Sequence, residues 1–229
     1  MITIVMPYYN NPGMLKHHIS VWEKYKKKND FRVIVVDDGS EKKAVDVFNE
    51  CGMPLQTQLY KILVDIPWNW IGAKNLGMTH ASGWCMMTDI DHVLDWDQAE
   101  RILQMKLDKE AVYVPRRRFP DGSENPKRHA NSFLIHNDLF WDIGGYDESF
   151  SGWYGTDSAF TRSLNGADKK TDEFALTLYG RSDIPDASTT EYSRKDGPYH
   201  VSKNKKLNER KYNTMEKIKP LNFPWERVI

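Results

Sequence analysis

Two aspartates, Asp89 and Asp91, stand one residue apart directly after a short apolar segment, residues 84–88. A strand that ends in two carboxylates can hold Mg²⁺ or Mn²⁺, because these hard ions prefer oxygen ligands. An ion that keeps open coordination positions can also bind a diphosphate. Paired acids at the start of a loop also serve as helix caps or solvated turn residues. The assignment therefore depends on other segments that point to the same site.

Two more polar segments follow predicted strands. Residues 7–11 follow the first strand, and Asp37-Asp38-Gly39-Ser40 follows the second. Strands are predicted at residues 2–6, 31–36, 59–64, 84–88, 111–114, 132–135 and 174–178. Helices are predicted at residues 14–28, 40–49, 71–79, 97–107, 138–143 and 156–164, with Ser40 as the cap of the second. Strands that alternate with helices indicate a parallel sheet, in which ligands bind beyond the carboxyl ends of the strands. We therefore expect the three polar segments to share one edge.

Composition bounds the class of protein. A chain of 229 residues, with 40% hydrophobic and 28% charged residues, predicts one domain with a sizeable core. Lys+Arg and Asp+Glu balance at 32 each, so the chain has no net charge that would attract it to nucleic acid or to a membrane. Cys51 and Cys85 suggest neither a disulfide framework nor a zinc site, which favours a reducing compartment. With no signal peptide and no apolar run of membrane-spanning length, we expect a cytoplasmic protein.

Five motifs occur together along the chain. They are I-V-M-P-Y-Y-N (4–10), V-V-D-D-G-S (35–40), G-A-K-N-L-G (72–77), T-D-I-D (88–91) and F-S-G-W-Y-G-T-D (150–157). In this order and spacing the chain resembles the GT-A nucleotide-sugar glycosyltransferases, especially family 2 and the Golgi-type β-galactosyltransferases. The resemblance spans about residues 2–166, with an extension to His200. It implies an α/β GT-A (Rossmann-like) fold, with a mixed, mostly parallel central sheet flanked by helices.

The resemblance also implies a division of the single domain, residues 1–229. Residues 1–95 would bind the nucleotide-sugar, residues 96–200 the acceptor, and residues 201–229 form a basic tail. On the donor side, Pro7, Tyr8 and Asn10 of the first loop and Asp37 would hold the nucleoside. A carboxylate can accept from ribose hydroxyls or a uracil N–H. The alternative for residues 37–40 is a turn and helix cap.

The same resemblance assigns the diphosphate and metal residues. Lys74 and Asn75 would lie beside the donor diphosphate or sugar, although Lys74 is also compatible with an exposed helix lysine. Asp91 would bind the metal directly, and Asp89 would contact ribose or bind through water. His200, in G-P-Y-H, is the candidate for a third metal ligand.

The acceptor side resembles a family segment that usually has the sequence G-W-G-x-E-D. Gly152, Trp153 and Tyr154 would contact the acceptor, with Trp153 as a flat face for sugar C–H groups or as a core residue. In this resemblance, Asp157 occupies the position of the family's catalytic base. Thr156 replaces the usual glutamate, which leaves one acid instead of two.

The resulting prediction is a metal-dependent, inverting hexosyl- or pentosyltransferase that uses a UDP-sugar and Mn²⁺ or Mg²⁺. A nucleotidyltransferase acting on a sugar phosphate is one alternative, but residues 8–13 lack its glycine-rich basic loop. A non-catalytic sugar- or nucleotide-binding module is the other.

The acceptor is a glycan or another hydroxyl-bearing molecule. A basic rim of Arg116–Arg118, Lys127-Arg128 and residues 203–211 would favour a polyanion, such as a phosphorylated glycan or a nucleic acid base that bears a hydroxyl. The alternative is that these segments are solvated surface loops.

Overall fold

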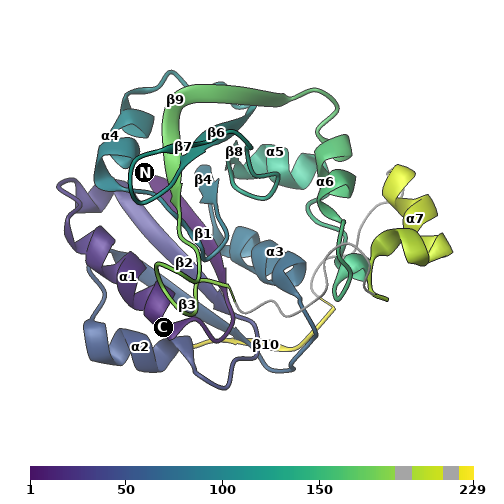
Figure 1. The fold of residues 1–229 in the computed structure, drawn as a ribbon, viewed down its shortest axis with the longest axis horizontal. Helices are drawn as coiled ribbons and strands as arrows, with labels where there is room; N and C mark the ends of the chain where they lie inside the picture. The colour runs from purple at the N-terminus through teal and green to yellow at the C-terminus, as the bar shows by residue number, and fades with distance from the viewer. Residues whose placement is uncertain (189–197, 214–221) are drawn as a thin grey trace.

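Strand β1 lies near the middle of a ten-stranded sheet in the computed structural model, which describes residues 1–188, 198–213 and 222–229 (Figure 1). The strand order is β10-β3-β2-β1-β4-β8-β6-β9-β5, with β7 paired to β6. The strands are β1 (Ile2–Tyr8), β2 (Phe31–Asp37), β3 (Gln56–Ile62), β4 (Trp84–Met87), β5 (His92–Val93), β6 (Val112–Arg118), β7 (Glu124–Asn125), β8 (Phe133–His136), β9 (Asp168–Leu178) and β10 (Trp225–Arg227).

Helices cover both faces of this sheet (Figure 1). They are α1 (Pro12–Glu23), α2 (Ala44–Cys51), α3 (Trp70–His80), α4 (Trp96–Gln104), α5 (Asn137–Asp142), α6 (Asp157–Ser163) and α7 (Lys205–Tyr212), with short 3₁₀ turns η1 (Lys28–Asp30), η2 (Glu148–Phe150) and η3 (Val201–Lys203). Among the described residues, no helix has the length and apolar character needed to cross a bilayer.

Strands β3, β2, β1 and β4 are parallel neighbours, as the sequence predicts. They end at one edge, which brings the loops after β1, β2 and β4 together. Strand β8 joins β4 in the antiparallel direction, with Met87 opposite Phe133. The start of β8 therefore lies at the edge where β4 ends. The mixed, mostly parallel sheet of the predicted fold class is confirmed.

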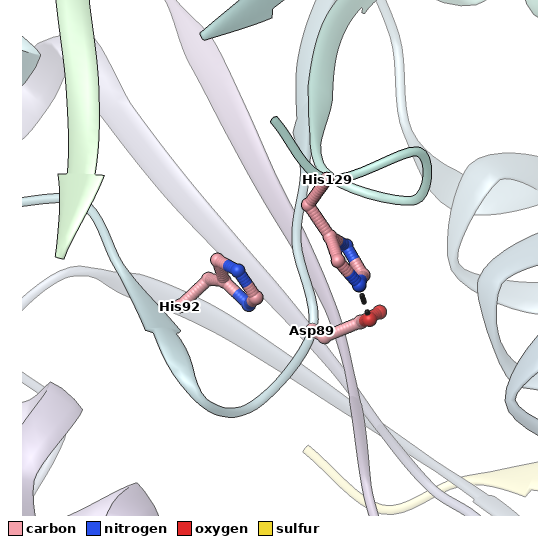
Figure 2. Close-up of side chains that lie close together, drawn as sticks. All are labelled: Asp89, His92 and His129. Atoms are coloured by element: carbon pink, nitrogen blue, oxygen red, sulfur yellow. Dashed lines mark ion pairs between the residues drawn. The ribbon is translucent and has the colours of Figure 1, made fainter. Parts of the chain in front are cut away.

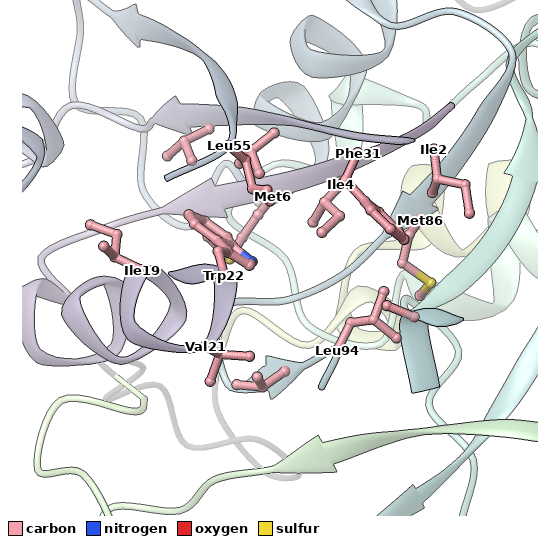
Figure 3. Packing of buried hydrophobic residues seen from close by; sticks show 14 of the residues in the cluster. Ile2, Ile4, Met6, Ile19, Val21, Trp22, Phe31, Leu55, Met86 and Leu94 are labelled. Atoms are coloured by element: carbon pink, nitrogen blue, oxygen red, sulfur yellow. The ribbon is translucent and has the colours of Figure 1, made fainter. Parts of the chain in front are cut away.

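Alternate residues of β1 supply two hydrophobic layers, as expected for a strand buried on both faces. Ile4 and Met6 pack with Trp22 of α1 and Phe31 of β2 (Figure 3). Val5 points to the other face, which α3, α5 and α6 cover. Packing in the two layers fixes the position and direction of β1 and therefore the position of the loop that follows it.

Two local predictions were wrong. Arg116–Arg118 do not form a loop but end β6, because they pair with residues 175–177 of β9. Ser40 does not cap α2, which begins at Ala44. The predicted acceptor half, residues 96–200, and the predicted basic tail, residues 201–229, extend into residues 189–197 and 214–221, which lie outside the described residues.

Gly77 sets how closely α3 approaches β1. A Cβ atom there would lie 2.5 Å from Val5 Cγ1. Alanine normally stabilises a helix interior by about 1 kcal/mol over glycine, but overpacking a core costs about 1–3 kcal/mol. We expect Gly77→Ala to lower the free energy of unfolding, measured by urea titration, by roughly 1–2 kcal/mol. Thr79→Ala, on the exposed side of the same helix, is the control. An equal or higher stability for Gly77→Ala would contradict this packing.

Candidate active site

A cavity of about 410 Å³ opens at the carboxyl ends of β1, β2 and β4. Pro7 and Tyr8 line it at the end of β1, and Asp89 and Asp91 line it beyond β4. The acceptor-side segment reaches the same cavity through residues 154–157. The three polar segments that follow strands therefore share one edge, as predicted, and the acceptor-side segment reaches the same cavity.

Main-chain contacts hold the D-I-D loop in place. The Thr88 hydroxyl donates to the His92 carbonyl oxygen at 2.9 Å, and the Asp89 carbonyl oxygen, 3.1 Å from the same hydroxyl, accepts from His92 N at 3.0 Å. His18 of α1 binds the Ile90 carbonyl through Nε2 at 2.8 Å. Burial lowers the pKa of His18 to about 4, so its ring is neutral, and Nε2 must carry the proton that it donates. The carbonyl oxygens of the loop thus have hydrogen-bond partners within the protein, whereas the carboxylates of Asp89 and Asp91 line the cavity.

The Lys74 ammonium is fully buried behind Asp89. Its Nζ donates to Asp89 Oδ1 and to the Asn131 carbonyl, both at 2.6 Å. Burial would raise the pKa of Asp89, but the positive charge of Lys74, aided by His129 and His92, outweighs it and holds this pKa below its usual value. Lys74 therefore acts on the cavity through Asp89 and is not an exposed helix lysine.

Asp89, His92 and His129 form a group that can hold a metal ion (Figure 2). One ligand atom from each lies within 4.8 Å of the others. Asp91 Oδ1 is 2.6 Å from His92 Nδ1, a contact that orients the ring and leaves Nε2 as the ligand atom. Imidazole suits first-row transition-metal ions and carboxylate oxygen suits Mn²⁺, so two imidazoles and a carboxylate favour Mn²⁺ over Mg²⁺. The residues present therefore fit the implied cation, although Arg117 Nη1 also lies 3.4 Å from His92 Nε2.

The sequence prediction named Asp89, Asp91 and His200 as metal residues. The structure brings the two aspartates together but places His200 at the start of η3, where its Nδ1 is 2.8 Å from the Ser202 hydroxyl. Its role as a ligand stays a prediction. His92 and His129 were missed; only the position of His92 directly after Asp91 could have indicated a ligand.

At the donor end, the structure separates the two acids of the second motif. The Asp37 carboxylate accepts from the backbone N–H groups of Ser40 and Ala44, both at 2.9 Å, and does not line the cavity. Asp38 does line it, and burial raises the pKa of Asp38 to about 7. Asn10, with φ of 55°, accepts from Lys42 N and shapes the loop from outside the cavity. The nucleoside role predicted for Asp37 is untested, and Asp38 is the acid placed to contact a ligand.

Asn75 is buried inside α3 and satisfies backbone groups. Its amide donates to the Tyr146 carbonyl and to Glu148, and its oxygen accepts from Tyr146 N. These contacts join α3 to the loop before η2. Asn75 does not line the cavity.

On the acceptor side, Asp157 is the first residue of α6 and lines the cavity. It accepts a hydrogen bond from Asn131 Nδ2 at 2.9 Å. Tyr154 also lines the cavity. Gly152 and Trp153 do not, and the Trp153 ring packs edge-on against Tyr199.

The raised pKa of Asp38 predicts how the stability of the protein depends on pH. Its raised folded-state pKa means that its contribution to stability is complete below about pH 4 and is lost as the pH rises through about 7. An asparagine side chain at this position mimics the protonated acid. We expect Asp38→Asn to gain stability relative to wild type between about pH 4 and about pH 8, by at most about 4 kcal/mol.

Urea unfolding in metal-free buffer at both pH values measures this difference. Asp168→Asn, which alters an exposed acid, should show no such gain. If the Asp38→Asn and wild-type stabilities change in parallel with pH, Asp38 is ionised in the folded protein throughout this range.

Comparison with known proteins identifies the family and the fold. The family model for glycosyl transferase family 2 matches residues 3–170. No curated protein matches the sequence. Among solved structures, S. aureus TarS 1–349 superposes with a TM-score of 0.64 at 15% identity, covering 81% of this chain and 62% of that one.

Two other similar solved structures contain Mn²⁺. The mannosyltransferase PcManGT from Pyrobaculum calidifontis, with GDP-Man and Mn²⁺, has a TM-score of 0.58 at 14% identity, covering 77% of this chain and 56% of that one. GalNAc-T7 with UDP, GalNAc and Mn²⁺ has a TM-score of 0.61 at 13% identity, covering 78% and 43%. The chain thus spans less than two thirds of each of these proteins. With a family match over most of its length and a GT-A fold, the chain belongs to glycosyl transferase family 2.

Proposed function

We propose that the protein is a metal-dependent, inverting glycosyltransferase that moves a sugar from a UDP-sugar to an acceptor hydroxyl. The observation that carries this proposal is that Asp157 and the pair Asp89 and Asp91 line one cavity. A carboxylate base and a diphosphate-binding acid pair are the two parts that transfer needs. TarS structures with UDP and with UDP-GlcNAc support a uridine nucleotide donor.

The chain's own residues perform the proton transfer. Asp157 takes the proton of the acceptor hydroxyl while the hydroxyl oxygen bonds to the anomeric carbon and the bond from that carbon to the diphosphate breaks. Asn131 holds Asp157 Oδ1, which fixes the direction of the base. Attack opposite the leaving group inverts the anomeric centre.

Asp89, His92 and His129 would hold the cation, with Asp91 beside them, and the two imidazoles favour Mn²⁺ over Mg²⁺. When bound, the ion offsets the charge on the departing diphosphate. The family match argues against the nucleotidyltransferase alternative. A non-catalytic binding module is the alternative that a turnover test excludes.

We expect Asp157→Asn to reduce sugar transfer roughly a hundredfold or more and to leave UDP affinity nearly unchanged, because asparagine keeps the shape but cannot take a proton. UDP release at saturating donor measures the rate, and calorimetry measures the affinity. Asp168→Asn, an exposed acid, is the matched control. Transfer by the Asp157→Asn protein within a few-fold of wild type would rule out Asp157 as the base.

We also expect UDP binding to require the cation. Removing one imidazole ligand should weaken Mn²⁺-dependent UDP affinity by about tenfold or more. Calorimetry with UDP, with and without Mn²⁺, should therefore separate His92→Gln and His129→Gln from wild type. His200→Gln tests the ligand that the sequence predicts. If wild type binds UDP equally well with and without Mn²⁺, the metal assignment is wrong. If only His200→Gln loses UDP affinity, the cation is bound at His200 and not at His92 and His129.

A further inference from the structure

The first turn of α1 is capped by a residue far along the chain. Backbone N–H groups at the start of a helix have no partner within the helix. In α1 these groups belong to Gly13 and Met14, because Pro12, the first residue, has no N–H. The Asp186 carboxylate accepts from both, with Gly13 N at 2.6 Å from Oδ2 and Met14 N at 2.9 Å from Oδ1. The loop that follows β9 is thereby joined to the N-terminus of α1.

Asn11, the residue before this helix, does not cap it with its side chain, although asparagine is among the best capping residues. Its Oδ1 accepts from Tyr9 N at 3.2 Å, and its Nδ2 donates to the Asp186 carbonyl. A cap from Asn11 would have satisfied the helix locally. The arrangement present instead joins Asp186 to the loop after β1, through both its carboxylate and its main-chain carbonyl.

The two segments that Asp186 joins line one end of the active-site cavity. The lining residues from the loop after β1 are Pro7, Tyr8, Tyr9 and Asn11, and those from the loop after β9 are Ala187 and Ser188. Ala187 is 1% exposed and packs in the same hydrophobic layer as α1. Asp186 does not line the cavity itself. It therefore acts on this end of the cavity through the two segments that it holds together.

Gly13 leaves the space that the Asp186 carboxylate occupies. A Cβ atom at this position would lie 2.8 Å from Asp186 Oδ1. Gly13 lies within α1, and alanine is the more favourable residue in a helix. The approach of the carboxylate, and not the backbone conformation, therefore explains the glycine.

We propose that Asp186 is a positioning residue for the donor. It holds residues 186–188 against the loop after β1 and so shapes the end of the cavity that takes the nucleoside in the proposed reaction. The acid pair and Asp157 are held by other contacts, through Lys74 and Asn131. Loss of Asp186 should therefore weaken donor binding and spare the chemical step. This inference rests on the proposed glycosyl transfer.

Calorimetry with UDP and with UMP in the presence of Mn²⁺ tests this role. Asp186→Ala should weaken the affinity for each nucleotide about fivefold or more, because UMP has the nucleoside but not the diphosphate. The donor KM, from UDP release with the UDP-sugar that gives turnover, should rise by the same factor, with kcat within about twofold of wild type. Asp183→Ala is the matched control, since this exposed carboxylate accepts from Gly180 N within its own loop.

Gly13→Ala disturbs the same contact from the helix side. The added methyl group should displace the Asp186 carboxylate and weaken UDP and UMP binding to a similar extent. Added to Asp186→Ala, it should cause no further loss, because both changes act through one contact. Asp186→Asn keeps one acceptor oxygen and should give an intermediate affinity. Urea unfolding shows which variants are folded, and these two milder changes carry the test if Asp186→Ala does not fold.

Several outcomes would overturn the inference while glycosyl transfer stands. One is that folded Asp186→Ala and Gly13→Ala proteins bind UDP and UMP within about twofold of wild type. Another is that the two losses multiply in the double variant. A fall in kcat with an unchanged donor KM would also overturn it, because Asp186 would then act on the chemistry. Failure of the proposed function differs: the wild-type protein would bind neither nucleotide and would release no UDP from any UDP-sugar.

Discussion

The buried ammonium of Lys74 joins the two halves of the site. A charge removed from water is tolerated only when it is paired and hydrogen-bonded, and Lys74 has two partners, Asp89 and the Asn131 carbonyl. Asn131 in turn holds Asp157 through its amide. The acid pair after β4 and the Asp157 carboxylate at the start of α6 are therefore linked through one lysine of α3 and through Asn131. A shift of α3 relative to the sheet would therefore move both the acid pair and Asp157. The close contact of Gly77 with Val5 of β1 sets the distance between α3 and the sheet.

The arrangement of the parallel strands could be predicted because it depends on local signals and one topological rule. Apolar runs bounded by turn residues mark β1, β2 and β4, and the carboxyl ends of parallel strands share an edge. The loops after β1, β2 and β4 consequently line one cavity, as the sequence predicts. This rule does not place Asp157, which begins α6; its assignment came from the family resemblance, and the structure shows that it lines the same cavity.

Other residues could not be assigned because tertiary contacts decide their roles. Neighbouring acids such as Asp37 and Asp38 look alike in sequence, yet one carboxylate binds backbone N–H groups and the other faces the cavity. Arg116 lies in a strand because β9, a distant segment of the chain, pairs with it. Trp68 and His129 carry no local signal, since each reaches the site through a loop whose course is fixed by distant partners.

The antiparallel pairing of β8 with β4 has a consequence for the course of the chain between β6 and β8. Because Met87 lies opposite Phe133, the chain enters β8 at the same edge where β4 leaves the sheet. The segment before β8, residues 119–131, therefore leaves the end of β6 and returns to the cavity at a fixed point, with His129 and Asn131 near its end. The same short stretch supplies a candidate metal ligand and the hydrogen bond to Asp157, so the coordination of a cation and the orientation of Asp157 depend on one route of the chain.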